Sequence, residues 1–393
     1  MKDMLGGVRI VDVTTIVMGP MASQILADLG ADVVKVEPPE GDLARYSGTP
    51  GPDGISSIFA SNNRNKRSIA LDLRSPDGQE VLTRLIEGGD VVLHNMRPKA
   101  AERLGLSAEA VRRIKPSIVH CVAVGFGSGG PYAGTAAYDD VIQAASGLAA
   151  LPLKVGRQPD YVPSIMADKV AALHIVYAVL AALMRRARTG EGCAVEVPMF
   201  EALAAFILNE HLGAATFEAG GKPGYQRLLS PHRRPFATAD GWISALPYTE
   251  AQWRRTLAEI GRMDVTEAPW FATAPGRNAN TATLYQILGA ALATRTTAQC
   301  LAMFEALDVP HARVNTLDDL IDDPHLAATG FFRPTDDLEG RARSVPQPVA
   351  FHGVEDRPDR APPALAADGA AVLEELGYSE AQVARMRADG TVL

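Results

Sequence analysis

The first 125 residues alternate short runs of β-branched residues with segments of helical spacing, and this alternation constrains the fold more than any other feature. The run VRIVDV at 8–13 precedes a Gly-Pro turn, the helix-like MASQILADLG at 21–30 and a second run that starts at Asp32. Strands that alternate with helices pair in parallel, because each helix crosses over the sheet. Such strands are apolar on both faces, as in SIALDL at 68–73 and DVVLHN at 90–95. We therefore expect an α/β fold with a parallel sheet.

The length of 393 residues exceeds the roughly 250–300 residues at which single cores stop growing, so more than one domain is expected. The sheet pattern ends near residue 215, which defines a large domain over 1–215. Residues 216–235 are rich in Gly, Pro, Arg and Ser and predict a linker or active-site loop. A small α+β domain is expected over 236–320. The segment 321–393 is expected to return to the large domain.

Charge and cysteine content exclude several classes of protein. The formal net charge of -8 argues against a nucleic-acid-binding protein, which needs concentrated positive charge. Three widely spaced cysteines offer neither a disulfide framework nor a CxxC metal site, so a cytoplasmic protein without a metal is expected. The longest apolar stretch, from Val170 to Met184, is shorter than the roughly 20 residues of a membrane span and predicts a core helix.

Gly125, Gly127 and Gly130 satisfy G-x-G-x-x-G after a predicted strand. In a dinucleotide fold this motif opens a helix, whose N-terminus meets the pyrophosphate. Here the chain continues through Pro131 as a loop, and no acidic residue ends a strand about 20 positions later. NAD and FAD are therefore not expected as cofactors.

Six collinear motifs carry a resemblance that covers nearly the whole chain. They are GADVVKVEPPEGD (30–42), NRNKRSIALDL (63–73), HNMRP (94–98) followed by ERLGL (102–106), AYDDVIQAASG (137–147), MADK (166–169) and VPHARVNTLDDLIDDPHLAATGFF (309–332). With these motifs the chain resembles the class III CoA-transferase family, also called the CaiB/BaiF family and including the formyl-CoA transferases. The resemblance implies a Rossmann-like large domain, a small domain and two chains interlocked as a homodimer.

Asp168 matches the aspartate that acts as nucleophile in this family. From its position alone a helix N-cap is the favoured role, because Asp before an apolar helix commonly accepts from free N–H groups, and the resemblance reverses that preference. The resemblance implies that Asp168 forms an anhydride with the acyl group and then a thioester with CoA, while an acyl-CoA and a carboxylic acid are the substrates. No cofactor beyond CoA and no metal are implied.

The resemblance also implies a CoA site. Backbone N–H groups of Val17 and Met18 match the loop beside the reacting thioester, although many members carry a polar residue at the position of Val17. Arg103 is the leading candidate for a phosphate contact, since the guanidinium fork suits phosphate oxygens. Where many members have a basic residue this chain has Pro38, so one contact is missing or supplied elsewhere. The other residues matched to the CoA site are Leu71, Arg74, Asn95, Met96, Arg97, Arg103, Tyr138 and Asp139.

Tyr138 and Asp139 separate the transferases from their nearest relatives. The α-methylacyl-CoA racemases resemble this chain but have a histidine at the position of Tyr138, which forms a two-base pair with the aspartate. A phenol with a pKa of ~10 is a poor base for that task, so Tyr138 is expected to contact CoA or the acyl chain. A racemase-like isomerase and a non-catalytic acyl-CoA-binding protein remain as alternatives.

The segment Ser230 to Pro235 lies where some formyl-CoA transferases have a glycine-rich loop that closes over the aspartyl-CoA. That run of glycines is absent, which argues against formate and oxalate as substrates. His232, Arg233 and Arg234 are instead expected to meet a substrate carboxylate, as in dicarboxylic acids. The alternative is an ordinary basic surface turn.

Overall fold

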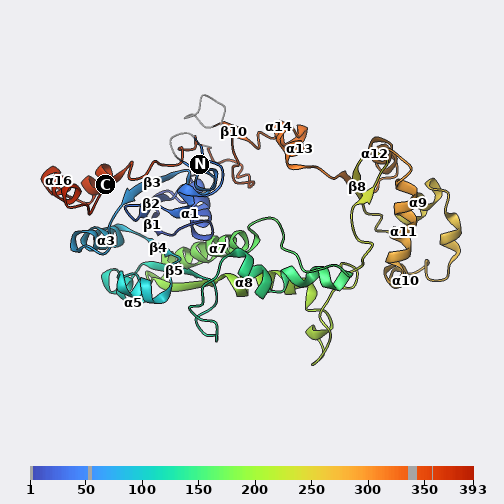
Figure 1. Cartoon of the computed structure of the whole chain (residues 1–393), viewed down its shortest axis with the longest axis horizontal. Coiled ribbons are helices and arrows are strands. Elements are labelled where there is room, and N and C mark those ends of the chain that lie inside the picture. Colours follow the sequence, from blue (N-terminus) through green and yellow to red (C-terminus); the bar gives the residue numbers. More distant parts are fainter. Residues whose placement is uncertain (1–2, 52–54, 335–342, 356) are drawn as a thin grey trace. The chain divides into compact units, whose positions relative to one another are not determined.

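The computed structural model describes residues 3–51, 55–334, 343–355 and 357–393, which form two compact units (Figure 1). The first unit comprises Met1–Leu148, Tyr161–Ile207 and Thr329–Leu393. The second comprises Ala149–Asp160 and Leu208–Ala328. The second unit thus includes a short insert from the middle of the first, and its limits differ from the expected 236–320. The C-terminal segment belongs to the first unit.

A six-stranded parallel sheet forms the centre of the first unit, which confirms the expected α/β class. Its order is β3-β2-β1-β4-β5-β6, so the direction of strand addition reverses between β1 and β4. Ligands of such sheets bind at the carboxyl ends of the strands where the order reverses. The strands are β1 (Arg9–Val13), β2 (Asp32–Glu37), β3 (Lys66–Ala70), β4 (Val91–His94), β5 (Val119–Val124) and β6 (Cys193–Pro198).

Helices connect these strands and begin where the sequence provides caps. The side chains of Ser56, Ser75 and Ser107 accept hydrogen bonds from N–H groups in the first turns of their helices. The helical elements are α1 (Met18–Asp28), η1 (Leu43–Tyr46), α2 (Ser57–Asn63), α3 (Pro76–Gly88), α4 (Pro98–Arg103), α5 (Ala108–Ile114), α6 (Asp139–Ala145), η3 (Leu148–Val155), α7 (Met166–Thr189) and α8 (Met199–His211).

The long helix α7 packs against α1, α6, β5 and β6. It has 24 residues, longer than the apolar stretch in the sequence, because polar residues at both ends join the helix. Among the described residues it is the one helix long and apolar enough to cross a membrane by length and composition, and 44% of its apolar window is buried inside the protein. The core helix of a soluble protein passes the same test.

The C-terminal segment adds to the core of the first unit. Val372 and Leu373 of α15 (Gly369–Glu375) and Met386 of α16 (Glu380–Ala388) pack with the sheet and α3. Val392 pairs with Leu71 in an isolated antiparallel bridge, which extends the sheet edge beyond β3. Two short strands, β10 (Arg333–Pro334) and β11 (Arg343–Ser344), pair with each other.

The second unit has its own apolar core around a three-stranded antiparallel sheet of order β7-β8-β9. Trp253, Phe271, Leu288 and Phe304 are buried there. This α+β unit agrees with the class expected for a small domain. Its elements are η4 (Gly213–Thr216), β7 (Phe236–Ala237), β8 (Trp242–Ala245), α9 (Glu250–Glu259), η5 (Met263–Glu267), α10 (Ala274–Ala279), α11 (Thr281–Leu292), α12 (Thr297–Ala306), β9 (His311–Arg313), α13 (Leu317–Ile321) and α14 (Pro324–Ala328).

Candidate active site

The loop from Thr14 to Met18 lies at the carboxyl end of β1, where the strand order reverses. Its backbone is held by side chains from distant parts of the sequence. The Asn95 amide accepts from the Thr15 N–H at 3.0 Å and donates to the Thr15 carbonyl at 2.9 Å. Ile16 has a φ of 72°, a left-handed conformation that β-branched residues avoid. The surrounding structure therefore determines the shape of this loop.

Asp168 lies in the first turn of α7 and points to this loop. Its Oδ1 accepts a hydrogen bond of 3.1 Å from the Met18 N–H, across 150 positions of sequence. The N–H groups of Ala167 and Asp168 donate to Oδ1 of Asp139 at 2.6 and 3.2 Å. Asp139 therefore caps α7, and Asp168 is not the cap that its sequence position allowed.

The surroundings of Asp168 disfavour its charged form. Burial and, to a smaller extent, the nearby Asp139 carboxylate raise the pKa of Asp168 to about 6, and the hydrogen bond from the Met18 N–H opposes both. The carboxyl is nevertheless ionised at neutral pH. A half-buried carboxylate with a raised pKa in a cavity is a candidate nucleophile or base.

A cavity of about 250 Å³ opens beside Asp168. Several residues predicted from the sequence meet here, among them Met18, Asn95, Arg97 and Tyr138. Gly125 permits the wall to close, because a Cβ there would lie 2.4 Å from that of Ala137. The full lining is Thr15, Ile16, Met18, Leu43, Asn95, Met96, Arg97, Pro98, Ala123, Val124, Gly125, Phe126, Ser128, Ala133, Gly134, Thr135, Ala137, Tyr138, Asp168, Glu196 and Met199.

Two consecutive N–H groups differ in their bonding. The Met18 N–H is engaged by Asp168, whereas the Val17 N–H has no hydrogen-bond partner among the described residues. Val17 itself is 4% exposed. A free N–H at the start of α1 offers a donor for a developing negative charge, and the helix dipole favours charge there.

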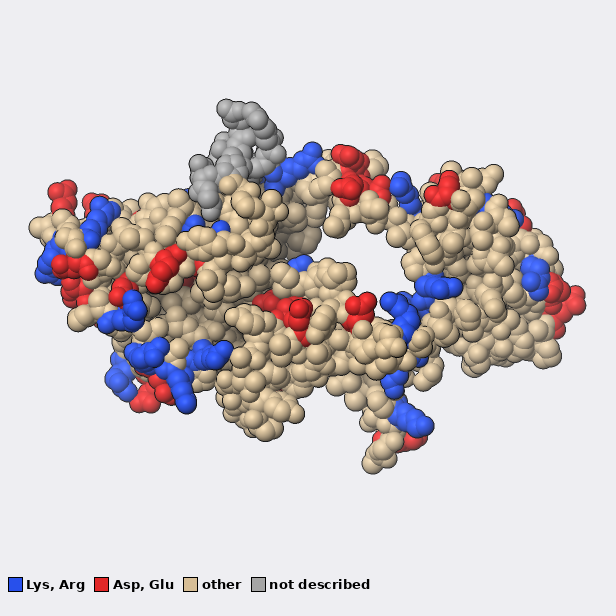
Figure 2. Space-filling view, in the orientation of Figure 1, with Lys and Arg blue, Asp and Glu red and all other residues tan. Residues whose placement is uncertain are grey.

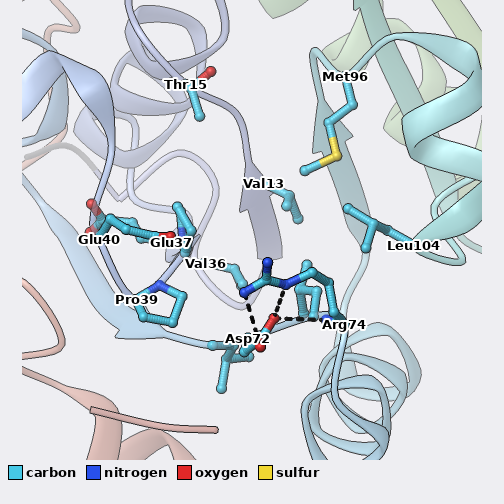
Figure 3. A pocket seen from close by; sticks show the side chains of 13 residues that line it. Val13, Thr15, Val36, Glu37, Pro39, Glu40, Asp72, Arg74, Met96 and Leu104 are labelled. Atoms are coloured by element: carbon cyan, nitrogen blue, oxygen red, sulfur yellow. Dashed lines mark hydrogen bonds and ion pairs between the residues drawn. The ribbon is translucent and has the colours of Figure 1, made fainter. Parts of the chain in front are cut away.

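A second cavity, of about 280 Å³, lies at the carboxyl ends of β1, β2 and β3 (Figure 3). Leu71, Arg74 and Met96 line it, as the sequence suggested for the CoA cleft, and Thr15 and Met96 line both cavities. Arg74 forms an exposed ion pair with Asp72 at 2.8 Å. The hydrogen bonds from Arg74 raise its pKa and lower that of Asp72.

Pro38, Pro39 and Glu40 also line this cavity, so the position of Pro38 supplies no cation there. Arg97 lines the Asp168 cavity and is exposed, whereas Arg103 is exposed but lines neither cavity. Basic side chains gather over α5 on the visible face of the molecule (Figure 2). The exposed cations of α4, α5 and the residue before α4 are Arg97, Lys99, Arg103, Arg112 and Arg113.

The predicted substrate loop lies in the second unit. His232 and Arg234 line a cavity of about 330 Å³ there, together with Trp242, Tyr285 and other residues of β7, β8 and α11. Arg233, between them, is exposed and does not line the cavity. Of the two adjacent arginines, Arg234 therefore faces this cavity and Arg233 does not.

Some residues at the site were missed by the sequence interpretation. Thr15 and Ile16 precede the predicted Val17 and Met18, but nothing in the sequence indicates the left-handed Ile16. Glu196 lines the Asp168 cavity and accepts from the Ser128 N–H at 2.9 Å. Its position at the carboxyl end of β6 was the available signal.

Two further expectations concern cofactors. The Gly125–Gly130 segment is a loop, as expected, and the Gly127 N–H donates to the carboxylate of Glu201. Within the described residues, no group of three or more His, Cys, Asp or Glu is placed to hold a metal ion.

Comparison with known proteins identifies the family. Residues 5–369 match CoA-transferase family III. The chain is 30% identical to a succinate–glutarate CoA-transferase of Agrobacterium fabrum over 95% of this chain and 96% of that protein. It is 29% identical to a formyl-CoA:oxalate CoA-transferase of Escherichia coli over 98% and 99% of the two chains. The crystal structure of a CaiB/BaiF family protein from Brucella suis is similar, with a TM-score of 0.82, 30% identity and coverage of 96% and 100%. The chain therefore belongs to CoA-transferase family III, a family of enzymes that transfer coenzyme A.

Proposed function

We propose that this enzyme moves CoA from an acyl-CoA donor to a carboxylic acid acceptor through covalent intermediates on Asp168. The observation that carries the proposal is a half-buried carboxylate, with a pKa raised to about 6, which faces a cavity and lies against the loop of Val17 and Met18. A carboxylate nucleophile retains the energy of the thioester, because each intermediate is itself an activated acyl group.

The reaction proceeds in four exchanges of acyl bonds. The Asp168 carboxylate attacks the donor carbonyl, the C–S bond breaks, and a mixed anhydride and a CoA thiolate result. The thiolate attacks the aspartyl carbonyl, which forms an aspartyl-CoA thioester and releases the donor acid. The acceptor carboxylate attacks this thioester, and a second anhydride and the thiolate form. The thiolate then attacks the acceptor carbonyl, which releases the new acyl-CoA and restores Asp168. No net proton is transferred.

The two N–H groups beside Asp168 have separate roles in these steps. The free Val17 N–H donates to the oxyanion of each tetrahedral intermediate. The Met18 N–H holds the Asp168 carboxylate in the resting enzyme and becomes available when that oxygen enters the acyl bond. Both donors belong to the backbone, so the absence of a polar side chain at Val17 does not remove this function.

We assign the nucleotide part of CoA to the cavity beside Leu71 and Arg74, and the thioester to the cavity beside Asp168. The shared lining residues Thr15 and Met96 support a continuous path for the pantetheine chain. Arg74 and Arg97 then supply charge to the phosphates. Because the position of Pro38 supplies no cation, the exposed arginines must neutralise more of the phosphate charge. The proposed mechanism requires no cofactor beyond CoA, since every step exchanges bonds of similar energy.

The acceptor class we propose is a dicarboxylic acid. One relative is named for succinate and glutarate, both dicarboxylic acids, and shares 30% of its residues with this chain. His232 and Arg234 line a cavity of the second unit, where the Arg234 guanidinium offers a cation for a substrate carboxylate. The absence of the glycine-rich loop favours longer dicarboxylic acids, such as succinate and glutarate, over formate and oxalate.

The homodimer also remains a proposal. Large apolar side chains stay exposed on the first unit, including Leu173, Tyr177 and Met184 along one face of α7 and Phe206 of α8. Exposed apolar side chains in such number favour a partner surface. Light scattering should give twice the chain mass, and a monomer would contradict the interlocked dimer. The cytoplasmic location likewise stays an expectation, which the free thiols of Cys121, Cys193 and Cys300 support.

The test of the proposed function is to trap the intermediate. The protein is incubated with succinyl-CoA and other acyl-CoA donors, treated with hydroxylamine, and digested for mass spectrometry. We expect a hydroxamate on Asp168, formed only when an acyl-CoA is present. Asp140→Asn serves as the control, because Asp140 is an exposed neighbour of Asp139 outside the cavity.

Three outcomes separate the candidate functions. An adduct on Asp168 together with CoA transfer to glutarate supports the transferase. Entry of solvent deuterium at the α-carbon of a 2-methylacyl-CoA, without an adduct, supports the racemase. Binding of CoA with neither reaction supports a non-catalytic protein.

A further inference from the structure

Four charged side chains lie beneath the 14–18 loop, fully shielded from solvent. Asp12, Lys35 and Asp42 are 0% exposed and Lys66 is 1% exposed. They come from β1, β2, the loop after β2, and β3, whose carboxyl ends lie side by side in the sheet. Lys35 pairs with Asp42 at 2.8 Å and Lys66 with Asp12 at 3.1 Å. None of the four lines either cavity of the proposed CoA site.

These side chains also bind the backbone that leads to Met18. Asp12 accepts from the Thr14 N–H at 3.0 Å, and Lys35 donates to the Thr14 carbonyl at 2.9 Å. Asp42 accepts from the Ile16 N–H at 3.0 Å. Lys66 donates to the carbonyl of Pro20, beyond the loop, at 2.9 Å.

The free-energy cost of burying four charged side chains argues that this network does more than stabilise the fold. Removing charged groups from water is costly, and well-packed apolar residues often serve a core equally well. Yet burial, which would raise the pKa of Asp12, is outweighed by the charges of Lys66 and Lys35 together with hydrogen bonds from Ser23 and Thr14, so the pKa of Asp12 is held below its usual range. Burial lowers the pKa of Lys66 to about 8, which still leaves the Asp12–Lys66 pair charged at neutral pH. The fixed oxygens and nitrogens of the network hold a loop in which Ile16 is left-handed.

The loop is also closed sterically at its far end. A Cβ at Gly19 would lie 2.3 Å from a methyl carbon of Thr14, so only glycine fits. With Thr14 fixed by Asp12 and Lys35, and Ile16 fixed by Asp42, little freedom remains for Val17 and Met18. These are the two residues whose N–H groups face the reacting acyl group in the proposed mechanism.

We infer that Asp12, Lys35, Asp42 and Lys66 are positioning residues for the reaction, which hold the 14–18 loop so that its N–H groups meet Asp168 and the oxyanion. The inference rests on the proposed function. It gives a role to Lys35 and Asp42 of the motif at 30–42 and to Lys66 of the motif at 63–73, which do not line the Asp168 cavity.

A second buried ion pair on the same unit provides a matched control. Arg64 pairs with Asp28 at the C-terminal end of α1, with side chains 5% and 7% exposed. Asp28 also accepts from Asn65, which bonds to Asp359 of the C-terminal segment. This pair therefore joins α1 to other parts of the fold and makes no contact with the 14–18 loop.

The experiment compares Asp12→Asn with Asp28→Asn in the full-length protein, with succinyl-CoA as donor and glutarate as acceptor. Both variants lose one charge of a buried ion pair and should lose stability. Only Asp12→Asn should lower kcat, by roughly tenfold to a hundredfold, with the KM for succinyl-CoA changed less than about twofold. Asp28→Asn should keep kcat within about twofold of wild type.

The pH profile is a readout that a general loss of stability would not move. Backbone hydrogen exchange becomes one when the amides of the 14–18 loop are compared with core amides of the same variant and with Asp28→Asn. Loss of the Met18 N–H bond should shift the inflection for Asp168 ionisation above about pH 6 in Asp12→Asn alone. Amides of Ile16 and Met18 should exchange faster in that variant. Asp42→Asn, which keeps an oxygen beside the Ile16 N–H, replaces Asp12→Asn if the latter does not fold.

The inference would be overturned if Asp12→Asn or Asp42→Asn kept both the wild-type kcat and the wild-type rate of amide exchange in the loop. An equal fall in kcat for Asp28→Asn would also overturn it. Failure of the proposed function is distinct. In that case the wild-type protein forms no adduct on Asp168, and the role of the network in catalysis is overturned with it.

Discussion

The two ends of the proposed CoA site are built in different ways. At the thioester end, Asp168, Asn95 and the 14–18 loop are joined by hydrogen bonds to partners up to 150 positions away. At the nucleotide end, Arg74 pairs with a near neighbour, Asp72, and Arg97 and Arg103 are exposed. The difference indicates that acyl transfer needs hydrogen-bond donors in fixed positions. Phosphate groups, by contrast, can be bound by exposed cations whose exact positions matter less.

Replacing Asp168, the proposed nucleophile, should abolish the reaction at the thioester end. In Asp168→Asn the amide cannot form the anhydride, so CoA transfer should fall by at least about a thousandfold, while CoA still binds. Transfer is measured by chromatography of the acyl-CoA products, and binding by calorimetry. A variant that transfers CoA at the wild-type rate would exclude Asp168 as nucleophile.

Lowering the pH should slow the reaction at Asp168 before it weakens CoA binding at the nucleotide end. With the pKa of Asp168 raised to about 6 by burial and Asp139, kcat/KM at pH 5 should be roughly tenfold below its value at pH 8. An inflection near pH 4 would contradict this environment for Asp168. Calorimetric binding of free CoA over the same range serves as the control.

The same raised pKa makes a prediction for stability. A carboxyl whose pKa is higher in the folded than in the unfolded state contributes stability below its unfolded pKa of 3.8, and this contribution is lost as the pH rises through about 6. Asp168→Asn removes the ionisable group, so it should stabilise the fold at pH 8 by about 1 to 2 kcal/mol after allowance for partial exposure, and by roughly half as much at pH 5, which lies midway between the unfolded pKa of 3.8 and the folded pKa of about 6. Thermal melts at both pH values check the sign.

The two ends of the proposed site also differ in how much of each could be predicted from the sequence. The parallel sheet followed from runs such as VRIVDV, because strands buried on both faces need apolar residues throughout. The resemblance directed attention to Asp168 and Asn95, and the structure brings both to one cavity. Arg103, the leading phosphate candidate, lines neither cavity. An exposed arginine has no local pattern that distinguishes a ligand from a solvated charge.

The buried network shows a signal that was visible but not used. Lys35 interrupts the run DVVKVE, and Asp12 interrupts VRIVDV, in strands expected to be buried on both faces. A charge in such a strand needs a partner, so the sequence indicated an ion-pair network. Which loop the network holds depends on the order of strands in the sheet, and pairwise register cannot be read from a single sequence.

At the nucleotide end, we expect an arginine substitution to weaken CoA binding more when that arginine lines one of the two cavities. Arg97→Ala should raise the Kd for CoA about fivefold to tenfold, Arg74→Ala about threefold because its pairing with Asp72 competes, and Arg103→Ala less than about twofold. Titration calorimetry at two salt concentrations measures each, and the effects should shrink as salt rises. A larger loss in Arg103→Ala than in Arg97→Ala would move the phosphates away from the proposed cavities.

The smallest effect is expected in the second unit, where adjacent arginines provide their own control. Arg234 lines the cavity and Arg233 does not, although both are exposed and carry the same charge. If Arg234 meets the second carboxylate of the acceptor, Arg234→Ala should raise the KM for glutarate about threefold to fivefold, with the KM for succinyl-CoA unchanged. Arg233→Ala should change neither by more than about 1.5-fold. Equal effects from the two arginines would mean that net positive charge on the loop, and not the cavity, attracts the acceptor.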